Sequence, residues 1–146
     1  MSEGAKRRVL LPVTCRLSPD LLKALLVGRL GLIDAEVTLL KVVKVPLTSP
    51  LEESEFSEEI ARAERELKQI AEKLSEAGVK AEVRVVLARN LVIGIEECLP
   101  RHDILIISSG SFGGTLRKVL SRISIEGLAA KFRTPVVVVS KELIGC

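Results

Sequence analysis

Residues 107–124, ISSGSFGGTLRKVLSRIS, combine three features of a site that holds a phosphate group. An apolar strand predicted over 103–109 leads into a turn of serine and glycine, and a helix is predicted over about 115–132. Backbone N–H groups are unpaired at the start of a helix, and the helix dipole favours an anion there. The stretch therefore predicts a loop in which a phosphate could be held by the backbone.

The same loop has a purely structural interpretation. A tight strand-to-helix turn needs residues that tolerate positive φ, and Ser111 or Thr115 would make a good N-cap. The basic residues Arg117, Lys118 and Arg122 would then form a solvated helix face. No GK[ST] follows the loop and no G-x-G-x-x-G follows the first strand, so two common nucleotide motifs are absent from the sequence. The residues alone leave both interpretations open.

Composition restricts the function classes. The 146 residues fit one domain, 1–146, with 47% hydrophobic residues. The net charge of +3 is small and its signs are interspersed, and three Phe without Trp or Tyr give few stacking platforms, so no nucleic-acid partner is expected. No apolar run is long enough to span a membrane and no signal peptide is evident, so we expect a cytoplasmic protein without a membrane partner.

Catalytic and metal-binding patterns are weak. Cys15, Cys98 and Cys146 are widely separated and fit neither a disulfide framework nor a zinc site, and Cys98 is expected to pack as a small hydrophobe. The only histidine, His102, has no nucleophile or second metal ligand arranged around it. We therefore expect no catalytic residue, no metal site and no enzyme, although slow ATP hydrolysis is not excluded.

Strand and helix signals alternate along the chain, which predicts a doubly wound parallel sheet with helices on both faces. Strands are predicted over 7–13, 35–45, 80–88, 103–109 and 134–140. Helices are predicted from an N-cap at Ser18 to a stop at Gly31, over 57–77, over 91–99 with Gly94 as a weak point, and over 115–132. The acidic, proline-containing segment 46–55 is predicted to be a mobile surface loop.

Ligands of such sheets bind beyond the carboxyl ends of the strands, where the strand order reverses. The loops at 12–18 and 108–114 follow the first and fourth strands, so they are expected to form this crevice.

Several phrases resemble the universal stress protein family over essentially the whole chain. They are VLLPVTCRLSPDLLKALLVG, EVTLLKVVKVP, HDILIISSGS and LRKVLSRISIEGLAAKFRTPVVVVS. The resemblance implies an α/β, Rossmann-like, adenine-nucleotide α-hydrolase-like fold with five strands in the order 3-2-1-4-5 and four helices. It also implies a homodimer formed through the last strand, here Val136, Val137, Val138 and Val139. An apolar edge strand of this kind needs cover, which agrees with that implication.

The nucleotide-binding branch of that family supplies candidate site residues. The resemblance implies Pro12, Val13, Thr14 and Val42 for the base and ribose, and Ser108, Ser109, Gly110, Gly113 and Ser124 for the phosphates. Two family features are altered in this sequence. Thr14 stands where the family has an aspartate, and no alignment puts a glycine at the third position of the phosphate motif.

These altered features favour a homodimeric regulatory or stress-response module with a degenerate nucleotide loop, acting on a protein partner. The alternative is a working sensor of ATP, ADP or AMP, with magnesium, that has weak or no ATPase activity.

Overall fold

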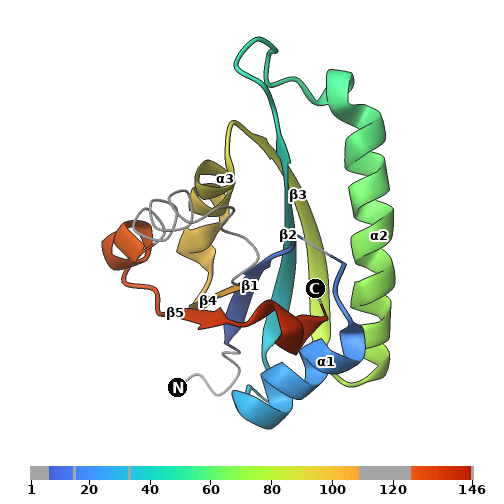
Figure 1. Ribbon diagram of the computed structural model, residues 1–146, viewed down its shortest axis with the longest axis vertical. Coiled ribbons are helices and arrows are strands. Elements are labelled where there is room, and N and C mark those ends of the chain that lie inside the picture. Colours follow the sequence, from blue (N-terminus) through green and yellow to red (C-terminus); the bar gives the residue numbers. More distant parts are fainter. Residues whose placement is uncertain (1–6, 15, 33, 109–125, 146) are drawn as a thin grey trace.

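A parallel five-stranded sheet with helices on both faces forms the centre of the computed structural model, which describes residues 7–14, 16–32, 34–108 and 126–145 (Figure 1). The strands are β1 (Arg8–Pro12), β2 (Glu36–Lys44), β3 (Lys80–Ala88), β4 (Ile104–Ser108) and β5 (Val136–Val139). Their order is β3-β2-β1-β4-β5 and every pairing is parallel. This confirms the fold class and strand order predicted from the sequence.

Helix α1 (Pro19–Lys23) begins as its sequence predicts. Ser18 Oγ accepts a hydrogen bond from Leu21 N at 3.3 Å, and Pro19 occupies the first turn. The helix then widens into the π-helical segment η1 (Ala24–Arg29), in which Leu30 N donates to Leu25 O at 2.9 Å. Gly31 follows at φ +63°, so the predicted helix stop is confirmed.

The leucine spacing of this helix does not by itself determine which leucines are buried. Leu22, Leu25 and Leu26 are buried, but Leu21 is 43% exposed. A 3.6-residue pattern places all four leucines on one broad face, whereas burial is decided by the side of the helix that meets the sheet.

Helix α2 (Ser57–Glu76) matches the helix predicted over 57–77 to within one residue. Ala63, Leu67 and Leu74 are buried at amphipathic helical spacing, and Gly78 ends the turn at φ +91°. Before it lies a short 3-10 turn, η2 (Glu53–Phe56). The first part of segment 46–55 is bound to the turn between β3 and α3. Arg89 of that turn donates hydrogen bonds to Pro46 O and, at 2.7 Å, to Ser49 O.

Helix α3 (Leu91–Cys98) starts at Asn90, whose side-chain oxygen accepts from Ile93 N at 2.9 Å. It is followed by the 3-10 turn η3 (Leu99–Arg101). Cys98 is fully buried, which confirms that it packs as a small hydrophobe. At Gly94, the expected weak point, a Cβ would lie 2.8 Å from Val42 Cγ1, so the glycine lets α3 approach β2 closely. Of the helix predicted over 115–132, the described residues 126–132 are helical.

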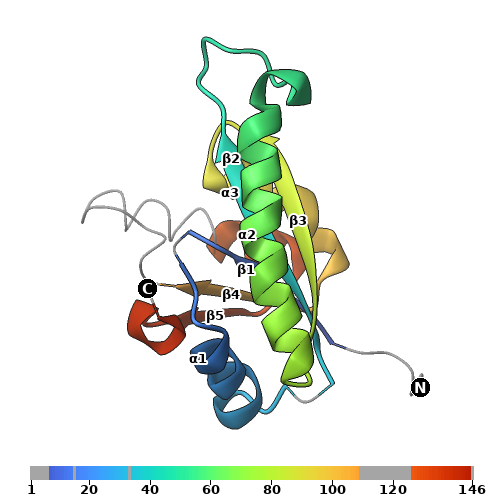
Figure 2. The ribbon, with the colours of Figure 1, turned by 90° about the vertical axis from the view of Figure 1, so that its right-hand side faces the viewer.

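The helices divide between the two faces of the sheet. Residues of α1, η1 and α2 share one apolar core with Leu11, Val37 and Leu39, whereas α3 and residues 126–132 share the other with Leu10 and Leu40. Figure 2 shows α2 running across the face of the sheet, with α1 beside its lower end. The turn η5 (Lys141–Ile144) returns to α1, where Ile144 O accepts from Ser18 N at 2.9 Å. In the part of the chain that the structure describes, no helix is both long and apolar enough to cross a membrane.

Candidate functional site

The carboxyl ends of β1 and β4 meet at the point where the strand order reverses. Leu10 pairs with Leu105, so continuing this register by three residues brings Val13 level with Ser108. Val13 N donates to Leu40 O at 2.7 Å, and Thr14 follows on the surface. Because the strand order reverses between β1 and β4, this edge is the expected ligand position in an open α/β sheet.

The predicted site residues are only partly brought together. Pro12, Val13, Thr14 and Ser108 lie at this carboxyl edge, with Pro12, Val13 and Ser108 buried and Thr14 exposed. Val42 is 6% exposed and packs in the core on the α3 side of β2. A role for Val42 in holding a base therefore stays a prediction, and its observed contact is with α3.

The remaining predicted phosphate-binding residues lie outside the described residues. They are Ser109, Gly110, Gly113 and Ser124. The basic residues Arg117, Lys118 and Arg122 of the same stretch are also outside them.

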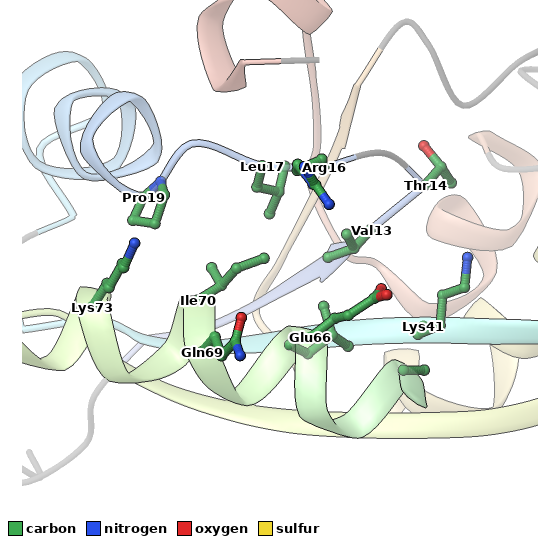
Figure 3. A pocket seen from close by; sticks show the side chains of 12 residues that line it. Val13, Thr14, Arg16, Leu17, Pro19, Lys41, Glu66, Gln69, Ile70 and Lys73 are labelled. Carbon is green, nitrogen blue, oxygen red and sulfur yellow. The ribbon is translucent and has the colours of Figure 1, made fainter. Parts of the chain in front are cut away.

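A cavity of about 590 Å³ opens beside the carboxyl end of β1, on the face of the sheet that α2 covers (Figure 3). We refer to it as the β1–α2 cavity. Its lining comes from the loop after β1, the first residue of α1, one residue of β2 and one face of α2. The lining residues are Val13, Thr14, Arg16, Leu17, Pro19, Lys41, Ala63, Glu66, Leu67, Gln69, Ile70 and Lys73. Its volume is within the range of about 300–1,000 Å³ that small-molecule sites occupy.

The cavity is elongated along α2. The lining residues of that helix extend from Ala63 to Lys73, which at a rise of about 1.5 Å per residue corresponds to roughly 15 Å. In Figure 3, Lys41 and Thr14 lie at one end, Lys73 and Pro19 lie at the other, and Arg16 lies between them. The shape fits an extended small molecule.

Positive charge predominates in the lining. Arg16, Lys41 and Lys73 oppose one carboxylate, that of Glu66, which leaves two positive charges. The ion pairs found within the described part of the chain, Arg8–Glu82 and Lys80–Glu36, involve none of these three cations. Apolar side chains of Val13, Leu17 and Ile70 line the same space. A ligand with an apolar body and an anionic group therefore suits the cavity.

Sequence reasoning identified Val13 and Thr14 but missed the three cations. One signal was present, because Lys41 interrupts the apolar run of the predicted strand 35–45. Successive strand residues face opposite sides, so a lysine beside the buried Val42 points to the other face of the sheet. Lys73 gave no such signal, since an exposed lysine on an amphipathic helix is ordinary.

His102 lies at the opposite, amino edge of the sheet, where it is structural. Its Nδ1 donates to Cys98 O at 2.8 Å, and its Nε2 lies 2.8 Å from Thr38 Oγ1. Thr38 Oγ1 in turn lies 3.1 Å from Glu82 Oε1, which Arg8 contacts at 2.8 Å. His102 is 7% exposed and has hydrogen-bond partners at both ring nitrogens. Among the described residues, no three His, Cys, Asp or Glu side chains gather closely enough to hold a metal ion.

Burial lowers the pKa of His102 below its ordinary value of 6.5, and Arg8 and Arg84 act in the same direction. The hydrogen bond to Cys98 O and the charge of Glu82 oppose this shift. Because the folded pKa lies below the unfolded one, the unfolded chain takes up a proton more readily as the pH falls through about 6.5. The histidine therefore stabilises the fold above that pH and loses this contribution below it.

We expect NMR titration of the single imidazole of this chain to give a pKa below 6.5. Denaturant unfolding at pH 8 and pH 5.5 should show a larger loss of stability for the wild-type chain than for His102→Gln, which has no imidazole to protonate. A pKa at or above 6.5, or equal losses in the two proteins, would contradict this account.

Comparison with known proteins finds similarity at the level of structure. No protein-family model matches the chain, and no curated protein matches it in sequence. Solved structures of universal stress proteins share its fold over nearly the whole chain. One universal stress protein in complex with cAMP has 15% identity and a TM-score of 0.58, covering 93% of this chain and 98% of that one.

Two further structures show the same fold. The universal stress protein of Archaeoglobus fulgidus in complex with dAMP has 10% identity and a TM-score of 0.56, covering 90% of this chain and 96% of that one. A universal stress protein family protein of Arabidopsis thaliana with AMP bound has 19% identity and a TM-score of 0.55, covering 92% of this chain and 91% of that one. The fold expected from the sequence resemblance is therefore confirmed.

Proposed function

We propose that this chain, which has the fold of the universal stress proteins, is a regulatory module that binds an adenine nucleotide at the carboxyl edge of its sheet. The observation that carries the proposal is the β1–α2 cavity, because it combines an apolar floor with a net positive lining next to Val13 and Thr14. Proteins of the same fold have been solved with AMP, dAMP and cAMP. The cavity offers such a ligand a place at the edge where open α/β sheets bind theirs.

The proposed activity is binding and not catalysis. Glu66 is the one carboxylate among the residues that line the described cavity, and it is exposed to solvent. Weak ATP hydrolysis and the participation of magnesium remain predictions of the sequence. We propose the cytoplasm as the site of action, for the same compositional reasons.

We further propose that the module is a homodimer formed through β5. This strand is at one edge of the sheet and pairs only with β4 among the described strands. Val138, at its centre, is 38% exposed. An apolar edge strand without cover is a template for pairing with another chain, and a second copy is one way to cover it.

A second candidate function is an interaction module that binds no nucleotide and acts on a protein partner. Thr14 favours it, because a hydroxyl at this position cannot form the charge-assisted hydrogen bonds of a carboxylate, which are about twice as strong as neutral ones. Measuring whether the protein binds a nucleotide distinguishes the two candidate functions.

We expect denaturation of freshly purified protein to release AMP, ADP or ATP detectable by chromatography, or calorimetric titration of the unloaded protein to show binding of AMP. The apolar floor supplies the base with a surface to bury, and the cations supply the phosphate with counter-charge. Protein that carries no nucleotide and gives no heat with AMP, ADP, ATP or cAMP would overturn the nucleotide proposal. It would leave the interaction module as the better description.

A further inference from the structure

β3 is a long edge strand, and no described strand pairs with its outer side. It pairs with β2 over all nine of its residues, Lys80–Ala88, and lies at the opposite edge of the sheet from β5. Figure 2 shows it running along one side of α2. Short length, proline or a bulge usually keeps an edge strand from pairing with another chain. β3 contains no proline and its register with β2 is continuous, so its backbone can pair with a further strand.

The charged side chains of β3 alternate in sign along one side of the strand. Lys80, Glu82 and Arg84 are two residues apart, so they project from the same side. When two copies pair antiparallel about a two-fold axis perpendicular to the sheet, residues of the same side face each other. A register centred on Val83 places Glu82 of each copy opposite Arg84 of the other, which is stabilising. Registers centred on Glu82 or on Arg84 bring like charges together instead.

The same register fits the apolar side of the strand. Ala81, Val83 and Val85 are partly buried and pack against the core that α2 covers. A register centred on Val83 brings Val85 of one copy opposite Ala81 of the other. Beside Ala81 lies a groove between α2 and β3, and Ala71 and Ser75 of α2 also line it. Because these side chains are small, the groove leaves room for the valine of a second copy.

The rim that α2 contributes to this groove is complementary to itself. Lys68 and Glu72 are both exposed and line the groove one helical turn apart. The same two-fold axis makes the α2 helices of two copies run antiparallel beside each other. The basic part of each rim therefore faces the acidic part of the other. Two sides of β3 and the neighbouring helix thus favour the same arrangement.

We propose that the outer edge of β3 is a self-association surface, to which a second copy of this chain adds its own β3 in the antiparallel register centred on Val83. The contact extends the sheet on the side opposite β5 and does not depend on dimerisation through β5. Glu82 already contacts Arg8 at 2.8 Å within the chain, and exposed ion pairs contribute little. The association is therefore weak, and it forms only at protein concentrations well above those on a chromatography column.

Disulfide cross-linking tests the register on the full chain, with Cys15 and Cys146 replaced by serine. Residue 83 faces its own copy at a separation that a disulfide can span, so Val83→Cys should form a covalent dimer on mild oxidation. Val85→Cys is the matched control, because it lies on the same side of the same strand and is also partly buried. The two copies of residue 85 would lie roughly 13 Å apart, too far to bridge. An equal mixture of Ala81→Cys and Val85→Cys chains should cross-link, whereas neither chain should do so alone.

A charge reversal without any cysteine gives an independent test. Sedimentation velocity of the wild-type chain between about 10 μM and about 1 mM should show a mass that rises with concentration. Arg84→Glu places two carboxylates opposite each other in the proposed register, so it should weaken this association about tenfold or more. Arg29→Glu is the matched control, because Arg29 is exposed at the end of η1 and undergoes the same change of charge. It should leave the association unchanged.

The opposite outcomes would overturn the proposal. Equal cross-linking of Val83→Cys and Val85→Cys would mean that the strands meet by random collision or in another register. A wild-type mass that does not rise with concentration, or an Arg84→Glu chain that associates like the wild type, would show that β3 does not bind its own copy. A dimer formed through β5 alone does not produce the disulfide at residue 83, so the two interfaces are distinguished.

Discussion

Replacement of Gly94 by alanine is expected to lower the free energy of unfolding by about 1–3 kcal/mol. The new Cβ would lie 2.8 Å from Val42 Cγ1 and closer still to Val42 Cγ2. Val42 is β-branched and pairs with Val86 of β3, so neither its rotamer nor its backbone can move away easily. The gain in helix propensity from glycine to alanine, about 1 kcal/mol, offsets only part of this cost. Denaturant unfolding monitored by circular dichroism measures the effect.

Two further variants identify the cause. Val42→Ala alone should destabilise by about 2 kcal/mol, since it leaves a buried space. Combined with Gly94→Ala it should be less destabilising than the sum of the single changes by about 1 kcal/mol or more, because the new methyl group occupies that space. Gly28→Ala is the control: a Cβ at Gly28 meets none of the described residues within 4 Å, so this helical position should keep or gain stability. Additive effects of Gly94→Ala and Val42→Ala would refute the contact.

The same variants test the predicted role of Val42 in holding a base. Val42 is buried under α3, so we expect Val42→Ala to change stability more than it changes the affinity for AMP. A large loss of affinity for AMP with little loss of stability would instead support a role for Val42 in binding the ligand.

Substitution of Val138 by lysine is expected to convert the proposed homodimer into a monomer. Val138 is 38% exposed and lies outside both apolar cores that the described residues form, so a lysine there should leave the folded chain intact. In a symmetric dimer the substitution brings two positive charges into one interface, and like charges facing each other there cost several kcal/mol. Since each 1.4 kcal/mol is a factor of ten, the dimer should weaken at least about a hundredfold. Light scattering coupled to size-exclusion chromatography measures the mass.

Leu47→Lys is the matched control for this experiment. Leu47 is 87% exposed and lies in the loop after β2, far along the sheet from β5, and it receives the same change from an apolar side chain to lysine. It should leave the mass of the assembly unchanged. A wild-type protein that is already monomeric, or a Val138→Lys protein that remains dimeric, would contradict dimerisation through β5.

The order of elements in this chain was predictable because it depends on local pattern. Near-continuous apolar runs predicted buried parallel strands, and all five were found with bounds within two residues of those expected. The amphipathic spacing of 57–77 predicted α2, which ends at a left-handed glycine as expected. The strand order came from the resemblance to universal stress proteins, since the alternation of strands and helices alone does not specify it.

The features that local pattern did not predict share one physical cause, which is packing between elements. The sequence alone suggested that Gly94 weakens a helix, whereas the structure shows that it lets α3 meet Val42. Leu21 carries the periodicity of a core residue and is nonetheless exposed. Periodicity describes which residues share a face, but only packing determines which face is covered.

Part of the candidate site could likewise be predicted from the sequence, and part of it depends on how the elements pack. The sequence by itself predicted a parallel sheet, and therefore that Thr14 and Ser108 lie at the same edge of it, because the carboxyl ends of parallel strands share an edge. Only the tertiary structure decided that Arg16, Lys41 and Lys73 line one cavity. Their convergence depends on where α2 lies across the sheet, and that position results from the burial of its apolar stripe, which carries no sign of the cations beside it.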